Sequence, residues 1–353
     1  INSLAERRYI GKDSAVARIS NFFDAIVIAK PDSIFNEKDK FIIDQYLMNG
    51  GKIVWLIDQV EVSMDSLQRS SSGNSRNTTL AMPKQLNLDD QLFQYGVRIN
   101  NDLIQDLRAA PIPVVSGQYG TQVRTEFFPW LYFPLLFSKN DHPINKNMDV
   151  VKAEFASSID LVGGSELKKS VILSTSKKTK TVKAPTRVSL NMLGFEPNED
   201  QFNKESVPIG VLVEGEFESI YKNRLTPNIL NSKQIQFKAR SPKTQQLFFS
   251  DGDLIRNEYN ENSNEFMALG YDRYTRQMYG NKDFMLQAIN FLVDESGLIL
   301  SKSKSFKIRL LDNEYIDRKR LLIQTLNTAI PIALVMLFGT LLFIIRKRKF
   351  AVK

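Results

Sequence analysis

The chemistry that this chain could perform centres on a few aspartates that follow predicted strands. Asp58 follows one short apolar run, and Asp251 and Asp253 follow another. In an open α/β sheet, ligands bind beyond the carboxyl ends of the strands, so these side chains should share one edge, with Lys30 nearby. Grouped carboxylates could bind a cation or a polar ligand. Aspartate and glycine are also typical of a tight turn after a strand, and we favour that interpretation.

The residues that the chain lacks exclude several classes of enzyme and metal site. Its 353 residues include no cysteine, which excludes disulfides, thiolate zinc sites and a cysteine nucleophile. The one histidine, His142, stands in an Asp-His-Pro turn sequence and is interpreted as structural. Gly50-Gly51-Lys52 lacks the upstream glycine and the following serine or threonine of a P-loop. We therefore expect no catalytic, cofactor-binding or metal-ligating residues in this chain.

The element that must position Asp58 is a strand–helix–strand unit over residues 24–58. Residues 25–29 and 53–57 are short apolar runs typical of buried parallel strands. Between them, Asn36 is placed to cap a helix that Asn49-Gly50-Gly51 ends. Strand, helix and strand in this order predict a parallel sheet of the α/β class, and an antiparallel arrangement fits the two runs less well. The helix is expected to bury Phe41, Ile42, Tyr46 and Leu47 and to expose Lys38, Asp39, Asp44 and Gln45.

Further elements are predicted along a chain that is β-rich over about residues 167–250. Strands are expected at residues 111–115, 171–173, 186–190, 209–213, 234–237, 246–249 and 308–311. Helices are expected at residues 89–95 and from about Lys282, the latter capped by Asn281. The apolar face of the latter helix comprises Phe284, Met285, Ala288, Ile289 and Leu292. Residues 70–79 hold no apolar side chain and are interpreted as a surface loop.

Residues 127–137 form an apolar, aromatic stretch. It is too short to cross a bilayer, and two prolines within it exclude a regular helix. We favour an extended segment packed in the core, because monomers rarely expose so much contiguous apolar surface. The alternative is an exposed patch for a partner or a membrane surface, with Phe128, Trp130, Tyr132 and Phe133 as its candidate residues.

The positive charge does not indicate a nucleic-acid partner. The formal net charge is +8, and the last eight residues alone contribute five positive charges. A second cluster lacks the interleaved aromatic residues on which single-stranded nucleic acid would stack. We interpret that cluster as a solvated hairpin edge whose lysines oppose strand addition. Its members are Lys168, Lys169, Lys177, Lys178, Lys180, Lys183 and Arg187.

Residues 326–345 are predicted to form one membrane-spanning helix. Fifteen of these 20 residues are apolar and none is charged, and a helix of this length spans about 30 Å. A run of basic residues at 346–349 follows at once, as expected of a cytoplasmic end. The chain is therefore divided into an α/β domain outside the cytoplasm (1–311), a juxtamembrane connector (312–325), the span (326–345) and a basic cytoplasmic tail (346–353).

Several motifs, in this order along the chain, resemble the auxiliary subunits of gliding-motility ABC transporters, the GldG family. They are FDAIVIAKP at 23–31, IDQYLMNGGK at 43–52, WLYFP at 130–134, HPI at 142–144, SDGDLIRN at 250–257, GYDR at 270–273 and YGNKDF at 279–284. The terminal span and its basic tail complete the resemblance, which extends from about residue 9 to the end.

The resemblance implies a flavodoxin-like, glutamine-amidotransferase-like fold without a catalytic cysteine, and a bacterial inner-membrane location with a large periplasmic domain. It implies a multi-span permease and a cytoplasmic ATPase as partners, with ATP bound by the ATPase, in a system for gliding motility and associated secretion. Family members usually also have an N-terminal span. The chain opens at Ile1 without a signal-like segment, so we expect that span and part of the domain to be missing.

We therefore expect a non-enzymatic accessory subunit whose periplasmic domain binds a partner or substrate. Small residues at Ala329, Ala333 and Gly339 are candidates for close packing of the span on the permease. Two alternatives stay open. One is a membrane-tethered enzyme or cation-binding protein that uses Asp58, Asp251 and Asp253, and the other is a structural link to periplasmic motility machinery.

Overall fold

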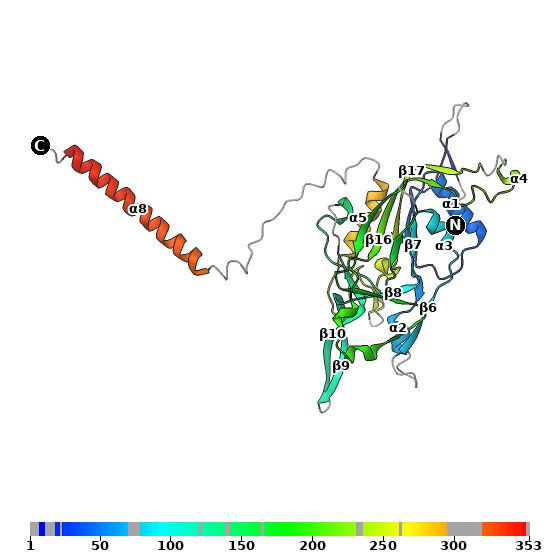
Figure 1. Cartoon of the computed structure of the whole chain (residues 1–353), viewed down its shortest axis with the longest axis horizontal. Helices are drawn as coiled ribbons and strands as arrows, with labels where there is room; N and C mark the ends of the chain where they lie inside the picture. Colours follow the sequence, from blue (N-terminus) through cyan, green and yellow to red (C-terminus); the bar gives the residue numbers. More distant parts are fainter. Residues whose placement is uncertain are drawn as a thin grey trace. The chain divides into compact units, whose positions relative to one another are not determined.

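The computed structural model describes residues 7–10, 18–21, 23–69, 78–119, 122–137, 142–163, 166–230, 236–260, 263–294 and 320–350. The chain divides into two units, Ile1–Ser303 and Lys304–Lys353. Figure 1 shows the first as a body of strands and short helices and the second as one long helix. Each unit is described by itself.

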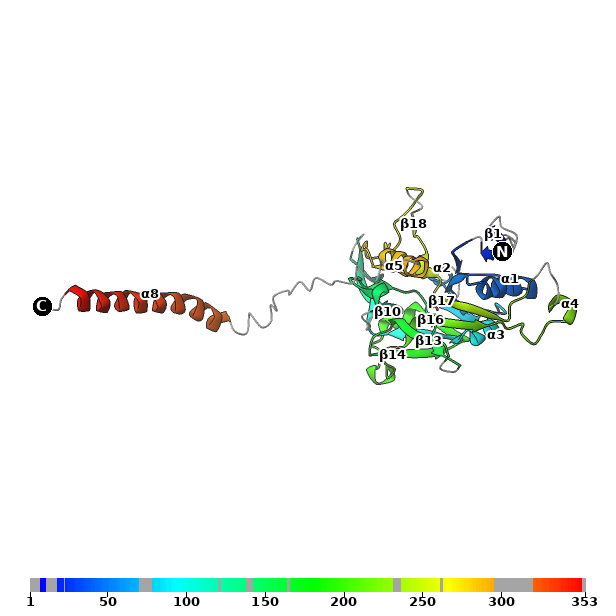
Figure 2. The same ribbon diagram turned by 90° about the horizontal axis from the view of Figure 1, so that it is seen from above.

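A five-stranded mixed sheet forms the centre of the first unit, in the strand order β13-β16-β17-β4-β3. Its strands are β3 (Ala25–Ala29), β4 (Lys52–Leu56), β13 (Lys168–Ser174), β16 (Pro208–Glu218) and β17 (Arg240–Phe249). β3, β4 and β17 run parallel, β16 pairs antiparallel with β17, and β13 pairs antiparallel with β16. In Figure 2, β17, β16 and β13 follow one another in this order.

The predicted strand–helix–strand unit is confirmed, but a wholly parallel, flavodoxin-like sheet is not formed. β3 and β4 pair in parallel across α1 (Glu37–Met48). The Asn36 side chain accepts a hydrogen bond from the Asp39 N–H at 2.8 Å, and Gly50 leaves the helix at φ +88°. Parallel strands need a crossover connection, usually a helix. The described part of the β16–β17 connection contains only the four-residue helix α4 (Pro227–Leu230), and these two strands pair antiparallel.

Alternate residues of the central strands face hydrophobic clusters on opposite sides of the sheet. On β4, Val54 belongs to one cluster and Trp55 to the other, and both are fully buried. Helix α5 (Asn281–Val293) packs in the first cluster, and α1 and α3 (Asp89–Gln94) pack in the second. Figure 1 shows α5 on one side of β16 and β17, with α1 and α3 on the other.

The predicted polar face of α1 is wrong at two positions. Asp44 and Gln45 are 0% and 4% exposed, because the chain that follows β16 lies against this side of the helix. Burial raises the pKa of Asp44 above its ordinary value. Its carboxylate accepts hydrogen bonds from the Tyr95 hydroxyl at 2.9 Å and the Ser219 hydroxyl at 2.6 Å, which offset the cost of burial.

The remaining strands form small sheets around this core, and short helices connect them. The strands are β1 (Arg7–Ile10), β2 (Arg18–Asn21), β5 (Val60–Glu61), β6 (Thr78–Pro83), β7 (Val97–Ile99), β8 (Asp102–Asp106), β9 (Ala109–Tyr119), β10 (Gln122–Leu136), β11 (Val151–Lys152), β12 (Ile159–Leu161), β14 (Thr179–Lys183), β15 (Thr186–Ser189), β18 (Tyr259–Asn260) and β19 (Glu265–Phe266). Helix α2 covers Met64–Arg69.

Most predicted elements of this part are confirmed. The strands expected at 111–115, 171–173, 186–189, 209–213 and 246–249 and the helix at 89–94 are present. Residues 236–237 are not in a strand, whereas 70–77, 234–235 and 308–311 lie outside the described residues. Thr78 and Thr79, expected in a loop, begin β6.

The predicted cap of α5 is wrong by one residue. The helix begins at Asn281, and the cap residue is Gly280, which makes no side-chain cap bond. The Asn281 side chain instead bonds the main chain of Lys152, accepting from its N–H at 3.0 Å and donating to its carbonyl at 2.8 Å. The Asn281 side-chain amide therefore joins β11 to α5 through two hydrogen bonds.

Residues 127–136 of the aromatic stretch belong to β10, and the stretch from Trp130 onward is largely core, as favoured, whereas Phe127 is 56% exposed. Trp130, Tyr132 and Phe133 are at most 2% exposed, so the alternative of a surface patch is wrong for these three. Side chains on both faces of β10 are covered here, by a cluster that includes Leu67 and Phe155. Phe128 is half-buried.

The lysine-rich cluster lies on β13, β14 and β15, with Lys177 and Lys178 in the segment between β13 and β14. Lys168 lies on β13, an edge strand of the central sheet, and its side chain is 72% exposed. Lys183 lies at the end of β14 and is also exposed. Both positions agree with solvated lysines on strand edges, but the predicted hairpin is wrong, because β13 pairs with β16 and β14 pairs with β8.

The second unit contains helix α8 (Arg320–Phe350), which is longer than the predicted span at both ends. By length and composition, Asn327–Lys349 can cross a membrane, with a mean hydropathy of 2.5. No described side chain of that stretch is buried. Residues 320–325 of the predicted connector and 346–350 of the predicted tail are helical, and the remainder of both segments lies outside the described residues.

Candidate functional site

The three predicted aspartates meet at the carboxyl ends of the parallel strands. Lys30 follows β3, Asp58 follows β4, and Asp251 and Asp253 follow β17. The Lys30 ammonium lies 3.1 Å from Asp58 Oδ2 and 2.6 Å from Asp253 Oδ1. The predicted proximity of these residues is therefore confirmed, because parallel pairing brings all three strand ends to one edge.

We call Lys30, Asp58, Asp251 and Asp253 the strand-end cluster. Backbone N–H groups donate hydrogen bonds to several of its carboxylate oxygens. Asp58 Oδ1 accepts the Gly252 N–H at 2.5 Å. Asp251, fully buried, accepts the N–H of Glu154 and that of Asp253, each at 2.7 Å. Burial and the nearby charges of Asp253 and Asp58 raise the pKa of Asp251 well above its ordinary value. The turn interpretation accounts for these contacts.

Gly252 is required by the close approach of two strand ends. A Cβ atom at this position would lie 2.7 Å from Cβ and 3.0 Å from Cα of Lys30. Lys30 itself adopts φ +46°, which turns its side chain back to the aspartates while its N–H bonds the Leu56 carbonyl at 2.8 Å. The glycine of the Asp-Gly-Asp sequence thus allows the end of β3 to pack closely against the turn after β17.

Four further charged residues extend the cluster, and the sequence analysis missed them. Arg256 contacts Asp253 at 3.0 Å and Glu154 at 3.1 Å. Lys152 contacts Glu154 at 2.8 Å and Asp272 at 2.5 Å. Burial alone would raise the pKa of Asp272 and of Glu154. The Lys152 ammonium, together with Arg256 and Arg273 at Glu154 and with the Thr275 hydrogen bonds at Asp272, outweighs burial, and both pKa values are lowered. The Lys152–Asp272 and Arg256–Glu154 contacts join segments more than 90 residues apart, and we find no local sequence signal for them.

The strand-end cluster leaves little space for a ligand. The cavity beside Lys152, Glu154 and Arg256 has a volume of about 30 Å³, far below the roughly 300–1,000 Å³ of small-molecule pockets. Among the described residues, no group of three or more histidine, aspartate or glutamate side chains is arranged to hold a metal ion. The geometry favours a structural role, in which ion pairs and hydrogen bonds hold the strand ends against the chain at 149–154. Ligand binding by Asp58, Asp251 and Asp253 stays a prediction.

His142 has a structural environment. Its Nδ1 accepts the Ile144 N–H at 3.3 Å, and its ring lies 4.9 Å from the Phe291 ring. Burial lowers the pKa of His142, which favours the neutral ring that accepts this bond.

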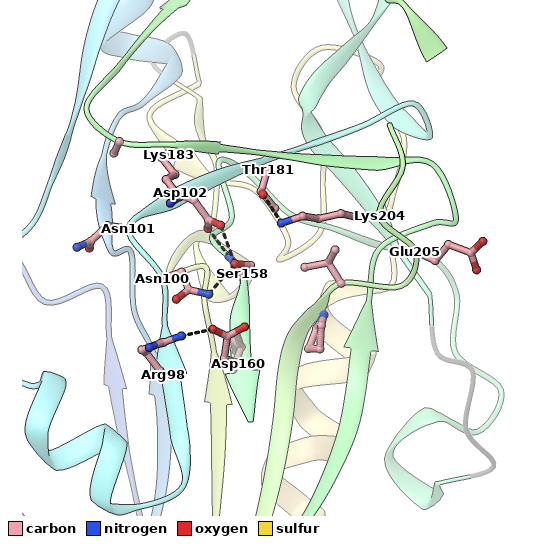
Figure 3. A pocket seen from close by; sticks show the side chains of 14 residues that line it. Arg98, Asn100, Asn101, Asp102, Ser158, Asp160, Thr181, Lys183, Lys204 and Glu205 are labelled. Carbon is pink, nitrogen blue, oxygen red and sulfur yellow. Dashed lines mark hydrogen bonds and ion pairs between the residues drawn. The ribbon is translucent and has the colours of Figure 1, made fainter. Parts of the chain in front are cut away.

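A much larger polar groove lies elsewhere, between β7, β12, β14 and the chain that enters β16. Its volume is about 720 Å³. Figure 3 shows Arg98 directed to Asp160 and Lys204 directed to Thr181, whereas Glu205 points away from the other labelled side chains. The sequence analysis placed only Lys183 of this lining in a cluster, because the groove assembles short segments that are remote in sequence. The polar lining includes Arg98, Asn101, Thr181, Lys183, Lys204 and Glu205.

Comparison with known proteins identifies relatives over most of the chain. An uncharacterized protein of Borreliella burgdorferi is 26% identical over 311 residues, which are 87% of this chain and 53% of the relative. The chain thus spans about half the length of the curated relative that it matches. The solved structure of the mmIFT52 N-terminal domain aligns with a TM-score of 0.36 at 11% identity, over 77% of this chain and 78% of that one. A score this low carries no argument about fold or function.

The family comparison is more decisive. Residues 3–288 match the family model described as an ABC-type uncharacterized transport system, ABC_transp_aux. The match covers the βαβ unit, the strand-end cluster and the polar groove. The more specific GldG resemblance is not established by this match. This chain belongs to the ABC-type transport system auxiliary family.

Proposed function

We propose that this chain is a non-enzymatic accessory subunit of an ABC transporter, anchored by α8 in the bacterial inner membrane with its α/β unit in the periplasm. The observation that carries the proposal is an auxiliary-family match over residues 3–288 in a chain that also has a membrane-length helix. Because the sequence has no P-loop, ATP hydrolysis is assigned to a cytoplasmic ATPase subunit. The orientation follows from the basic residues at 346–349.

The span is proposed to pack on a multi-span permease through small residues. Ala329 and Ala333 are four residues apart and lie on one side of α8. Gly339 follows Ala333 by six residues, which rotates its direction by about 240° in a regular helix. The two alanines therefore form the sharper candidate face, and Gly339 belongs to a different side.

Co-purification tests the accessory role directly. The tagged chain is extracted from native membranes in a gentle detergent and its partners are identified by mass spectrometry. A permease and an ATPase recovered in stable proportion support the proposal, and recovery of this chain alone contradicts it. The double variant Ala329→Leu with Ala333→Leu should reduce permease recovery. A matched enlargement on the opposite side, Leu334→Phe with Leu342→Phe, should not.

The resemblance to gliding-motility subunits extends the proposal to gliding and the associated secretion of adhesins. A strain that lacks this chain should then lose surface spreading and surface adhesins, and the wild-type gene should restore both. Normal gliding in the deletion strain would restrict the proposal to a transporter with another purpose.

A further inference from the structure

The edge of β14 beside the polar groove lacks a full strand partner. The even-numbered residues of β14 face β8: the Lys178 carbonyl accepts the Leu107 N–H at 3.1 Å, and Ala184 N–H donates to the Asn101 carbonyl at 2.9 Å. Odd-numbered residues therefore direct their main-chain groups to the other edge. There, Thr179 exchanges two hydrogen bonds with Lys204, at 3.0 and 2.9 Å.

After this one bridge the chain at 204 diverges from β14. Within the described residues, no main-chain hydrogen bond reaches the outward N–H or C=O of Thr181 or Lys183. Both residues line the groove of about 720 Å³. The groove thus presents two residues of strand edge, whose donors and acceptors have the two-residue spacing of an extended backbone.

The charges that face the groove are positive on balance, although its lining contains three cations and three carboxylates. Arg98 is paired with Asp160 at 2.6 Å. Both oxygens of Asp102 accept hydrogen bonds from Ser158, at 2.8 and 2.7 Å.

The third carboxylate, that of Glu205, points away from the other labelled side chains in Figure 3. Lys204 donates to the neutral Thr181 hydroxyl at 2.6 Å. Among the described residues, no salt bridge joins Lys183 or Lys204 to a carboxylate, although the Lys204 charge contributes to lowering the pKa of Asp160. The two lysines therefore leave positive charge beside a free strand edge.

We propose that this groove binds an extended acidic peptide, whose main chain pairs with Thr181 and Lys183 and whose carboxylates contact Lys183 and Lys204. Strand addition supplies affinity through main-chain hydrogen bonds, and the lysines select acidic side chains. The groove lining has no aromatic side chain on which nucleic-acid bases would stack. The proposal adds a ligand class to the accessory role and in that sense rests on it.

Binding is tested with the purified full chain in detergent and three labelled eight-residue peptides. The first alternates glutamate with threonine, the second has glutamine in place of glutamate, and the third is the first with alternate main-chain amides methylated. Fluorescence anisotropy should show saturable binding of the first peptide that weakens as salt is added. The glutamine and methylated peptides should each bind about tenfold more weakly or worse, because they lack the charge and the donors respectively.

A charge-reversal pair locates the site. Lys183→Glu with Lys204→Glu should weaken binding of the acidic peptide by about tenfold or more. Lys38→Glu with Lys177→Glu makes the same change in net charge at exposed lysines outside the groove lining and should leave affinity within about twofold. Tryptophan fluorescence of buried Trp55 and Trp130 checks that both variants are folded.

Several results would overturn the proposal. They are absence of saturable binding at millimolar peptide, equal binding of the methylated peptide, and equal loss of binding in the two charge-reversal variants. Equal displacement of the peptide by heparin and by unlabelled peptide would indicate a general anion site and would also overturn it. Because the assay uses the chain alone, its failure leaves the co-purification test of the transporter role untouched, and the reverse also holds.

Discussion

The strand-end cluster and the polar groove are both rich in charged side chains, yet they are built in opposite ways. In the cluster, Asp251, Asp253 and Lys152 are nearly inaccessible, each bonds to charged or main-chain groups, and the free volume is about 30 Å³. In the groove, Lys183 and Lys204 are exposed, have no carboxylate partner among the described residues, and line about 720 Å³. Removing one partner of a buried ion pair destabilises a fold, whereas charges left without a salt-bridge partner beside open space are available to a ligand.

The largest effect on stability should come from removing Lys152, the buried cation of the strand-end cluster. Lys152→Met leaves the carboxylates of Asp272 and Glu154 without their nearest ammonium, which should lower the free energy of unfolding by about 3–5 kcal/mol. Denaturant unfolding followed by tryptophan fluorescence measures this loss. The control Lys168→Met breaks an exposed pair with Glu214 and should cost less than about 1 kcal/mol. Similar losses in the two variants would contradict the comparison.

Gly252→Ala should cause a smaller decrease in the free energy of unfolding. The added Cβ would lie 2.7 Å from Lys30 Cβ and force the two strand ends apart, at a cost of about 1–3 kcal/mol. Gly194→Ala meets no atom within 4 Å and should leave the unfolding midpoint unchanged. If both alanine variants unfold alike, the close approach at Gly252 does not matter for stability.

The difference in stability between wild type and Lys152→Met should depend on pH. The pKa values of Glu154 and Asp272 are lowered in the fold, so the stabilisation from their pairing is complete above about pH 4.5 and is lost as pH falls through the lowered values. The difference should shrink by about 1–2 kcal/mol between about pH 6 and pH 3. Unfolding curves at a series of pH values measure it, and a difference that grows toward acid would contradict the assignment.

The smallest effect on stability should come from the groove. Lys183→Glu with Lys204→Glu removes no ion pair and should change the free energy of unfolding by less than about 0.5 kcal/mol. The same denaturant titration measures it. A loss of several kcal/mol would mean that these lysines support the fold, and the contrast with the strand-end cluster would then fail.

The sequence by itself determined the features that depend on local pattern. Asn36 and Gly50 bound α1 because capping bonds and a left-handed residue act within one turn of the helix. The apolar run at 326–345 predicts α8 by length and composition alone. Two parallel strands with aspartates at their ends predicted where Asp58 and Asp251 would meet.

Only the tertiary structure decided the features that depend on segments far apart in the chain. The antiparallel pairing of β16 with β17 joins residues such as Gly210 and Phe249. The burial of Asp44 beside Ser219 and the Lys152–Asp272 ion pair require partners more than 100 residues away. The periodicity of one segment shows which face is apolar but not which distant segment will cover it. The groove is likewise set by where β7, β12 and β14 stop pairing, and the position at which a strand edge is left free is a property of the assembled fold.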